Sequence, residues 1–362
     1  MRQSQPGRLN HMIKVLFVTA STTGGGAERM LFNIIRSLDA GHEARLFITS
    51  DARVPQAYRE DVESYNAEKI HAISAFTKLV KYIREYRPDH VFTTSSNIGY
   101  MIVLAKKLLR AKYKTYIRCA VPPSEIYQTD IKTRLLNRVI SLTYNSADLI
   151  IAQTDYSRDD LIKAYHLSPE RVRTIRNIVD TVFVNKQADE LIPTELIPSN
   201  YNIVAAGALY SVKGFDLLIE ASAPLIKGTD RHLYILGEER YEDGYKDFLL
   251  KKIGEAGAKE NIHLLGHRKN PYPYFKSADL FVMSSRKEGY PNVVLEALSL
   301  NTPVVATDCV DWSGVIEPSV NGIVVRKNDV EKLREAIDKA FRTDFHCRSN
   351  QLKNYNYNDL FS

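Results

Sequence analysis

Cysteine is scarce in this sequence, since the 362 residues include only three, at Cys119, Cys309 and Cys347. So few cysteines, so far apart, exclude a disulfide framework and a cysteine-based zinc site. Long apolar runs are also absent, because none reaches the ~18 residues that a membrane-spanning helix requires. The first eleven residues are polar and contain no apolar stretch typical of a secretory signal. We therefore expect a protein of the reducing cytoplasm.

The composition is otherwise that of a globular protein, with 44% hydrophobic and 25% charged residues. A chain of 362 residues is longer than a single hydrophobic core usually supports, so two domains are expected. We find no internal repeat and no low-complexity segment, which excludes a solenoid or a fibrous protein.

The net charge is +6, and two groups of basic residues stand out in the first half of the chain. They are Lys78, Lys81, Arg84 and Arg87, followed by Lys106, Lys107, Arg110, Lys112, Lys114 and Arg118. Three interpretations stay open: a solvated basic face, attraction to an anionic membrane surface or a lipid diphosphate, and nucleic-acid binding. The third is disfavoured, because no recognition motif is present and the aromatic residues do not alternate with the basic ones.

Strand-like and helix-like segments alternate along the first half of the chain. Runs of β-branched and aromatic residues predict strands at 14–19, 44–49, 88–93, 113–118, 148–152 and 172–175. Apolar spacing predicts helices at 27–38, 77–86, 99–109, 133–144 and 157–165, the last capped by Ser157. This alternation predicts an α/β domain at residues 12–180, with a parallel sheet covered by helices on both faces.

The pattern breaks at residues 181–200, which contain Pro193 and Pro198 and show little periodicity, and we interpret them as a linker. It restarts with strands at 201–206, 233–236 and 262–265, and with helices at 215–223, 246–256, 272–276 and 329–341. A second doubly wound domain is therefore predicted at 201–345, and we expect a ligand in the cleft between the carboxyl ends of the two sets of strands.

Residues 284–297 are the most informative stretch, and they read Ser-Ser-Arg-Lys-Glu-Gly-Tyr-Pro-Asn-Val-Val-Leu-Glu-Ala. An apolar strand leads into a turn with Gly289 and Pro291, and a helix follows. The turn offers free backbone N–H groups and the positive end of a helix dipole to an anion such as a diphosphate. Glu288 and Glu296 can each hold sugar hydroxyls, which suits a nucleotide-sugar. The alternative is that both carboxylates only favour a helix start and a solvated face.

A glycine-rich turn, Thr22-Thr-Gly-Gly-Gly-Ala-Glu28, connects the first predicted strand to the first predicted helix. Its glycines allow backbone N–H groups to approach a bulky ligand. A dinucleotide fingerprint is excluded, because Arg29 stands where the third glycine is needed, and a Walker loop is excluded because no Gly-Lys-Ser/Thr follows. A flexible turn without a ligand is the alternative.

The stretch 284–297 resembles the Glu-x7-Glu signature of retaining glycosyltransferases of the GT-B fold, family 4, of the bacterial polysaccharide-biosynthesis type. Residues 207–219, 302–308 and 321–325 resemble further segments of the same family. The resemblance implies two Rossmann-like domains that face each other across a cleft, the first binding the acceptor and the second the nucleotide-sugar donor. It also implies that the tail, residues 346–362, can cross back to the first domain.

The resemblance implies roles for individual residues. Glu288 would orient the hydroxyls of the donor sugar, Glu296 those of the ribose, and Lys213 would place a positive charge on the departing diphosphate. We therefore regard Glu288 and Lys213 as catalytic. The predicted donor-binding residues are Gly25, Gly26, Gly207, Arg268, Gly289, Tyr290, Pro291, Asn292, Val293 and Glu296. The candidates for acceptor binding are Asn97 and Arg118.

Two departures from the family pattern concern the groups that would contact the substrates. Ala208 stands where the family usually has an arginine that adds a second positive charge. Either Lys213 and the helix N-terminus near Asn292 suffice for the diphosphate, or another basic residue supplies the charge. The candidates are Arg286, Lys287 and Arg29. The histidine that many members carry in the first domain has no counterpart in the comparable stretch, residues 116–123.

These features predict a retaining glycosyltransferase that moves a hexose or N-acetylhexosamine from a UDP-sugar to a saccharide acceptor, with a lipid-linked saccharide as the expected acceptor. No cofactor and no obligate metal are expected, because no Asp-x-Asp motif stands in a suitable loop. The expected location is the cytoplasm, at the inner face of the membrane. Two alternatives stay open: a nucleotide-sugar epimerase on the same fold, and a non-catalytic partner subunit of another transferase.

Overall fold

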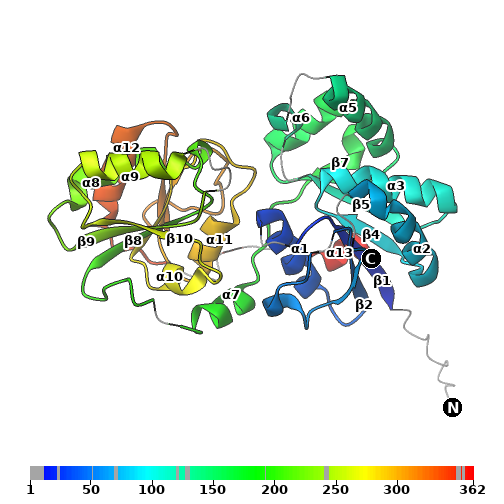
Figure 1. The fold of residues 1–362 in the computed structure, drawn as a ribbon, viewed down its shortest axis with the longest axis horizontal. Coiled ribbons are helices and arrows are strands. Elements are labelled where there is room, and N and C mark those ends of the chain that lie inside the picture. The colour runs from blue at the N-terminus through cyan, green and yellow to red at the C-terminus, as the bar shows by residue number, and fades with distance from the viewer. Residues whose placement is uncertain are drawn as a thin grey trace, which may run out of the picture. The chain divides into compact units, whose positions relative to one another are not determined.

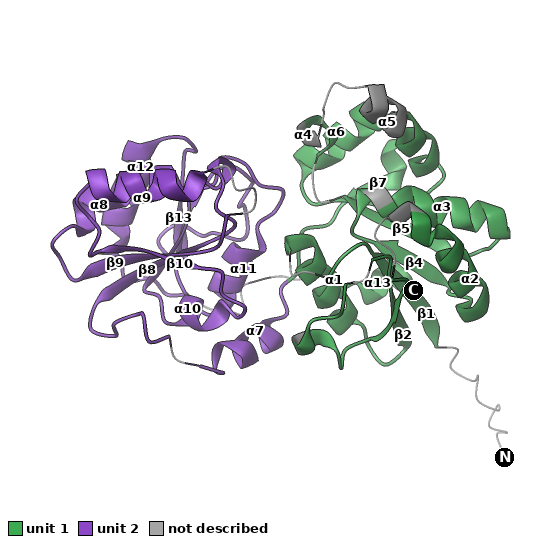
Figure 2. Ribbon diagram, in the orientation of Figure 1, with its two compact units in different colours: residues 1–178, 355–362 green, residues 179–354 purple. Residues whose placement is uncertain are grey.

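The computed structural model divides the chain into two compact units, which Figure 2 distinguishes by colour. Unit 1 comprises residues 1–178 together with 355–362, and unit 2 comprises residues 179–354. The structure describes residues 12–22, 25–50, 52–68, 72–119, 122–126, 131–191, 193–239, 244–347, 352 and 355–362. Each unit is built around one parallel sheet (Figure 1).

The sheet of unit 1 has the strand order β3-β2-β1-β4-β5-β6-β7, and every pair of neighbouring strands is parallel. The strands are β1 (Ile13–Thr19), β2 (His42–Ile48), β3 (Glu63–Asn66), β4 (His90–Thr93), β5 (Lys114–Cys119), β6 (Leu149–Ala152) and β7 (Val172–Thr174). The order changes direction between β1 and β4, because β2 follows on one side of β1 and β4 on the other.

The helices of unit 1 are α1 (Gly26–Ser37), α2 (Phe76–Tyr86), α3 (Ser96–Leu109), α4 (Pro123–Ile126), α5 (Ile131–Tyr144), α6 (Asp155–Tyr165) and α13 (Asn358–Phe361), with short 3-10 turns η1 (Gln56–Tyr58), η2 (Ala72–Ala75) and η3 (Pro169–Arg171). Leucine, isoleucine and valine side chains of α2, α3, α5 and α6 share one hydrophobic cluster with strand residues such as Leu16, Val91 and Ile117. These helices therefore cover one face of the sheet.

The opposite face of this sheet receives the end of the chain. Phe361 in α13 is completely buried, and its ring lies 6.1 Å from that of Phe17, 5.9 Å from that of Phe92 and 5.4 Å from that of Tyr116. The Tyr116 hydroxyl also donates a 3.0 Å hydrogen bond to the Leu360 carbonyl. The last residues of the chain are thus part of the core of unit 1.

The sheet of unit 2 has the order β10-β9-β8-β11-β12-β13, again with parallel neighbours throughout. Its strands are β8 (Tyr201–Ala206), β9 (Arg231–Leu236), β10 (Ile262–Gly266), β11 (Leu280–Met283), β12 (Val304–Thr307) and β13 (Gly322–Val325). Its helices are α7 (Thr181–Ala188), α8 (Phe215–Ile226), α9 (Tyr245–Glu255), α10 (Tyr272–Lys276), α11 (Asn292–Ser299) and α12 (Val330–Ala340), with the 3-10 turn η4 (Ser211–Lys213).

Two hydrophobic clusters show how helices cover both faces of this second sheet. Ile203 and Leu233 point into a cluster with α8, α9 and α12, whereas Val204 and Tyr234 point into a cluster with α7, α10 and α11. Successive side chains of a strand point to opposite faces, so both faces need an apolar cover. The predicted arrangement, a parallel α/β sheet in each half of the chain, is confirmed.

Some details differ from the sequence-based prediction. The stretch interpreted as a linker, residues 181–200, contains helix α7, and β3 was not predicted. Helix α6 begins at Asp155, and its cap is Thr154, whose hydroxyl accepts a hydrogen bond from the Ser157 backbone N–H. Ser157 is therefore inside the helix, and the prediction that it caps the helix is wrong.

Candidate functional site

The most informative polar cluster of unit 2 lies where the strand order changes direction. Strands β9 and β10 extend from one side of β8, and β11, β12 and β13 from the other. The loops that follow β8 and β11 consequently leave the same edge of the sheet side by side and turn apart. This is the position at which parallel α/β sheets bind ligands, and both predicted catalytic residues, Lys213 and Glu288, are in these two loops.

Lys213 and Glu288 form an ion pair. Lys213 Nζ lies 2.6 Å from Glu288 Oε1, and the side chains retain 19% and 14% of their exposure, respectively. The Ser285 hydroxyl donates a second hydrogen bond, of 2.7 Å, to the same carboxylate oxygen. Both bonds end on Oε1, so Oε2 is the atom through which this carboxylate can accept hydrogen bonds from a ligand.

The backbone around Lys213 explains how this lysine is positioned. Gly214 follows in the left-handed region with φ +65°, and a Cβ at this position would lie 2.2 Å from the Ser284 carbonyl oxygen. The Ser284 hydroxyl in turn donates a 3.1 Å hydrogen bond to the Lys213 carbonyl. A Cβ on Gly207 would lie 3.3 Å from the Lys213 side chain. Because glycine has no Cβ, the lysine side chain has room at this place.

A second ion pair joins Arg286, in the loop after β11, to Asp216, in the first turn of α8. Arg286 makes a bidentate bridge to Asp216, at 2.8 Å from Oδ1 and 2.7 Å from Oδ2, and Tyr245 donates to Oδ1 at 2.8 Å. Burial tends to raise the pKa of Asp216, but the hydrogen bonds from Arg286 and Tyr245 outweigh it and lower that pKa. Arg286 is therefore held in an ion pair, as Lys213 is, and its side chain keeps 30% of its exposure.

Helix α11 carries the other carboxylate of the signature. It begins at Asn292 after Pro291, and Glu296 is one turn further on and only 2% exposed. The Tyr272 hydroxyl lies 3.5 Å from Glu296 Oε1. Tyr290, Pro291 and Asn292 are buried, and Gly289 and Val293 are partly exposed. The predicted donor residues 289–293 thus connect Glu288 to the N-terminus of this helix.

Arg268 follows β10 on the far side of β9 from the pair. Its guanidinium donates to the Tyr274 hydroxyl and to Glu195 Oε1, both at 2.8 Å. The Tyr274 hydroxyl donates a 3.1 Å bond to the same oxygen of Glu195. Arg268 is thus held by residues of its own unit, and its side chain remains 29% exposed.

The predicted residues of unit 1 lie near its own change of strand direction, between β1 and β4. Gly25 caps helix α1 after β1, and Gly26 is the first residue of that helix. A Cβ on Gly25 would lie 2.5 Å from Glu28 Oε2, which shows how closely this side chain covers the turn. Asn97 is in the first turn of α3 after β4, and its side chain is outside the described part.

Arg118, at the carboxyl end of β5, is fully buried. Its Nη2 donates a hydrogen bond to Asn177, and Tyr357 of the C-terminal tail interacts with the guanidinium electrostatically. Within the described residues, Arg118 Nε and Nη1 and the Tyr357 hydroxyl make no hydrogen bond of good geometry. Burial lowers the pKa of this arginine, and Tyr357 opposes that effect. The Arg118 guanidinium has no exposed surface, and its hydrogen bond to Asn177 joins two segments of unit 1.

Neither a metal cluster nor a spanning helix is found among the residues that the structure describes. No group of three or more histidine, cysteine, aspartate or glutamate side chains is placed to hold a metal ion in that part of the chain. In the same part, no helix combines the length and the apolar character needed to cross a bilayer.

Two parallel α/β units of this topology agree with the GT-B fold. A family model described as Glycosyltransferase Family 4 matches residues 24–183, and one described as Glycosyl transferases group 1 matches residues 200–343. Between them they match most of the chain. The chain belongs to glycosyltransferase family 4, and it is a glycosyltransferase.

Curated relatives carry the names of polysaccharide-building enzymes. A Campylobacter jejuni N-acetylgalactosamine-N,N'-diacetylbacillosaminyl-diphospho-undecaprenol 4-alpha-N-acetylgalactosaminyltransferase is 29% identical over 80% of this chain and 79% of its own length. An amylovoran biosynthesis glycosyltransferase of Erwinia amylovora is 22% identical over 82% of both chains. An O-antigen chain mannosyltransferase of Escherichia coli is 26% identical over 60% of this chain and 58% of its own.

Solved structures confirm the GT-B fold. HepE of Anabaena, crystallised with UDP and glucose, matches with a TM-score of 0.75 and 21% identity over 91% of this chain and 90% of its own. WaaG, a glycosyltransferase involved in lipopolysaccharide biosynthesis, matches with a TM-score of 0.63 and 18% identity over 93% and 92% of the two chains. At these identities the likeness concerns the fold.

The two residues of the ion pair carry a sequence signal, whereas the groups that hold them do not. Ser285, Asp216 and Tyr245 have no motif of their own, because their role depends on loops that are distant in sequence. The one available signal was their position after predicted strands or at a predicted helix start, where polar residues gather at the carboxyl edge of a parallel sheet.

Proposed function

We propose that this glycosyltransferase transfers a hexose or N-acetylhexosamine from a UDP-sugar to a saccharide acceptor, with retention of the anomeric configuration. The observation that carries the proposal is the ion pair between Lys213 and Glu288, partly exposed at the change of strand direction and next to the N-terminus of α11. A cation and a helix N-terminus suit the negative diphosphate, and the nearby carboxylate suits the hydroxyls of the sugar.

In the proposed complex, Lys213 and the N–H groups at the start of α11 neutralise the diphosphate as it departs. The pair with Glu288 keeps the lysine ammonium at the loop before the donor arrives, which lowers the entropic cost of placing it. Glu288 stays bonded to Ser285 through Oε1 and offers Oε2 to a hydroxyl of the donor sugar. Glu296, one turn further along α11, accepts hydrogen bonds from the ribose hydroxyls.

The proposed chemistry uses no obligate metal ion, because Lys213 and the helix N-terminus supply positive charge where the leaving group develops negative charge. Departure of UDP creates an oxocarbenium-like sugar, and the acceptor hydroxyl attacks from the face that the UDP has left. The leaving phosphate accepts the proton of that hydroxyl, so no side chain is required as a base. Gly25, Gly26 and Asn97 are the proposed contacts in unit 1.

For the acceptor we propose a lipid-linked saccharide, used at the cytoplasmic face of a membrane. Support comes from the Campylobacter relative, whose name includes a diphospho-undecaprenol acceptor, and from the relatives named for amylovoran and O-antigen chains. Support for the donor comes from HepE, which was crystallised with UDP-glucose.

The test is a transfer assay on the full chain with UDP-, GDP- and ADP-sugars and undecaprenyl-diphosphate-linked saccharides. We expect a UDP-sugar to stabilise the protein against heat and the product to keep the donor's α-configuration, read from its anomeric proton by NMR. A β-configured product would contradict retention, and the absence of stabilisation by any nucleotide-sugar would contradict the donor.

The same assay tests Glu288. Glu288→Gln should lower kcat by about 100-fold or more, since an amide is a weaker acceptor for the sugar hydroxyl and breaks the pair with Lys213. Glu255→Gln, which removes an exposed ion-paired carboxylate of the same unit, is the matched control and should leave kcat unchanged.

Full activity in excess EDTA is expected, and activity restored only by added Mg²⁺ or Mn²⁺ would refute a metal-independent reaction.

A further inference from the structure

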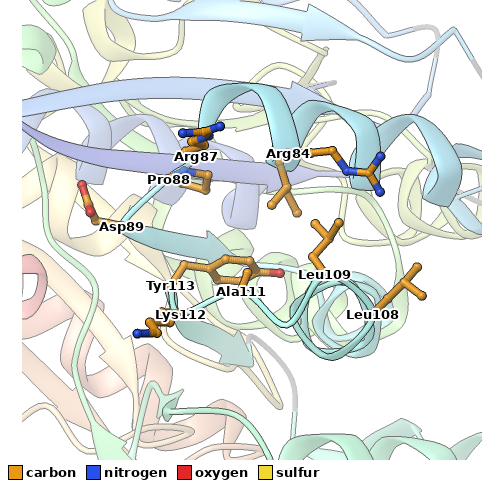
Figure 3. Close-up of a pocket in the computed structure, with 10 residues that line it drawn as sticks. Arg84, Arg87, Pro88, Asp89, Leu108, Leu109, Ala111, Lys112 and Tyr113 are labelled. Carbon is orange, nitrogen blue, oxygen red and sulfur yellow. The ribbon is translucent and has the colours of Figure 1, made fainter.

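A pocket of about 470 Å³ opens on unit 1 (Figure 3). Its lining residues Pro88 and Lys112 precede β4 and β5, whereas Gly25 and Asn97 follow β1 and β4, so the pocket is at the opposite end of the sheet. It lies between the C-terminal ends of α2 and α3, which stop at Tyr86 and Leu109. The segments that lead into β4 and β5 form the rest of the wall. A pocket of this size is within the range of small-ligand sites, ~300–1,000 Å³.

The charged part of the lining is mainly basic. Arg84, Arg87 and Lys112 are exposed, and within the described residues none of their side chains makes a hydrogen bond or ion pair. Asp89 is the acid of the lining, and its Oδ2 accepts a 2.9 Å hydrogen bond from the Lys14 backbone N–H. The lining therefore has a net positive charge and offers guanidinium and ammonium donors that no protein carboxylate uses.

The uncharged part of the lining is apolar. Ile83, Pro88, Leu109 and Ala111 contribute to the wall, and the buried ring of Tyr113 lies beside them with its hydroxyl bonded to the Ile102 carbonyl. Figure 3 shows Arg84 on α2 and Leu109 on α3, the two helices that border the opening. An opening of this kind suits a ligand that joins an anion to hydrocarbon.

Exposed leucines continue the apolar surface along α3. Leu108, in the lining, is 65% exposed, and Leu104, one turn earlier, is 40% exposed. Basic residues at helix C-termini are expected from the helix dipole alone. The dipole does not account for exposed leucines next to them, whereas an anionic membrane surface accounts for both.

We propose that this pocket binds the phosphate headgroup of an anionic membrane phospholipid, with Arg84, Arg87 and Lys112 around the phosphate and Leu104 and Leu108 among the acyl chains. The inference rests on the proposed function, because a lipid-linked acceptor requires the enzyme to work at a membrane. It assigns the membrane contact to the amino ends of β4 and β5, an edge that the proposed transfer reaction does not use.

The test is co-sedimentation of the full chain with vesicles of pure phosphatidylcholine and of phosphatidylcholine with 30% phosphatidylglycerol, ~30% being a level chosen to give a clearly anionic surface. The variant is Arg84→Ala/Arg87→Ala/Lys112→Ala. We expect wild type to bind the anionic vesicles and release them as salt rises. The variant should bind on the order of 100-fold more weakly, since each basic side chain at such a surface contributes roughly fivefold.

The matched control removes the same number of charges elsewhere. Lys163, Lys186 and Lys246 are exposed lysines outside the pocket, and Lys163→Ala/Lys186→Ala/Lys246→Ala should bind anionic vesicles within about threefold of wild type. Leu108→Ser should weaken binding without changing its salt dependence. Equal losses in the two triple variants would overturn the proposal, because net charge would then explain the binding.

Two further experiments test whether the bound phosphate belongs to a lipid or to a soluble ester, and whether the pocket variant still binds donor and transfers sugar. Millimolar glycerol 3-phosphate should not displace the protein from vesicles, and displacement would replace the lipid with a soluble phosphate ester as ligand. UDP-sugar stabilisation and transfer to a short water-soluble acceptor should be intact in the pocket variant. If the pocket variant keeps both transfer and vesicle binding, the pocket proposal alone is wrong. If wild type binds vesicles but binds no donor, the proposed function alone is wrong.

Discussion

Unit 1 and unit 2 each contain one parallel sheet with a basic residue near its carboxyl edge, but the two residues differ in burial. In unit 1, Arg118 is completely enclosed and bonded to Asn177, with Tyr357 beside it. In unit 2, Lys213 keeps 19% of its side-chain exposure and is paired with Glu288, which keeps 14%. The basic side chain at the carboxyl edge is thus fully buried in unit 1 and partly exposed in unit 2.

The difference teaches which charge is structural and which is available for chemistry. A buried guanidinium whose nearest partners belong to its own unit contributes to the arrangement of the chain, since it cannot reach a ligand without unfolding. A partly exposed ion pair on a loop is able to exchange its partner for a ligand at small cost. The four predictions that follow test this contrast, and they are ordered by expected effect.

The largest effect is expected from Phe361→Ala. Removing this fully buried ring should lower the free energy of unfolding of unit 1 by about 3–5 kcal/mol. The single tryptophan, Trp312, is in unit 2, so its fluorescence reports that unit, and circular dichroism reports both. We expect the first circular-dichroism transition in urea to move while the Trp312 transition stays.

The control for that experiment is Leu142→Ala, which truncates a side chain of α5 that is 68% exposed and should change neither transition. A Trp312 transition that moves as far as the circular-dichroism transition would contradict the assignment of residues 355–362 to unit 1 alone.

The second effect concerns the partly exposed lysine of unit 2. Lys213→Met should lower kcat by about 100- to 1,000-fold, because one donor to the developing charge is lost. The free energy of unfolding should change by about 1 kcal/mol or less, since the lysine is partly exposed. Lys252→Met, which removes a lysine paired with Glu220 on the same unit, should leave kcat unchanged. A kcat that falls equally in both variants would show that the lysine has no special role.

The third effect is a dependence of unit 1 on pH. Burial lowers the pKa of His90 from 6.5 to about 4, and its Nδ1 lies 3.0 Å from the Tyr116 hydroxyl that holds the tail. The unfolded chain therefore takes up a proton at higher pH than the native one. His90 contributes its full stability above pH ~6.5, and this is lost as pH falls toward ~4.

Acidification from pH 7 to 5 should accordingly lower the free energy of unfolding of unit 1 by up to about 2 kcal/mol through His90. His90→Gln, which keeps a hydrogen-bonding group beside Tyr116, should reduce that slope in urea titrations. A slope that is unchanged in the variant would assign the acid sensitivity to other groups.

The smallest effect is expected from Arg118→Met. It leaves the Asn177 amide oxygen without its donor, but it also relieves the desolvation of a buried cation, so the free energy of unfolding should change by about 2 kcal/mol or less. Transfer should stay within tenfold of wild type, a range of about 1.4 kcal/mol. An acceptor KM raised ~100-fold with unchanged stability would instead support Arg118 as a residue that binds the acceptor, one of the two candidates from the sequence.

The sequence predicted the parts of the fold that carry an apolar pattern. Strands such as β1 and β8 and helices such as α2 were found within a few residues of their bounds. Strand β3 was missed because three of its four residues are exposed, so that this edge strand has no apolar run. Helix α7 was missed because only Val184 and Ala188 of its eight residues are buried, which gives too short a stripe to detect.

The site was predicted as residues and not as contacts. Lys213 and Glu288 were both identified, with one assigned to the diphosphate and the other to the sugar. Their ion pair was not foreseen, because the two residues are 75 positions apart and become neighbours only through the crossover that places β11 beside β8. The same crossover joins Arg286 to Asp216. Arg286, a candidate cation for the diphosphate from the sequence, is thus ion-paired in the structure.

The order of apolar and polar residues by itself determined that this protein has two parallel α/β units. The roles of Glu288 and Glu296 came from the family resemblance and stay predictions. Periodicity and loop chemistry are local, and a single sequence displays them directly. Only the tertiary structure decided which charges are fully buried and which stay partly exposed, since pairing and burial depend on segments brought together from distant positions. It enclosed Arg118 under the end of the chain and left Lys213 and Glu288 within reach of solvent.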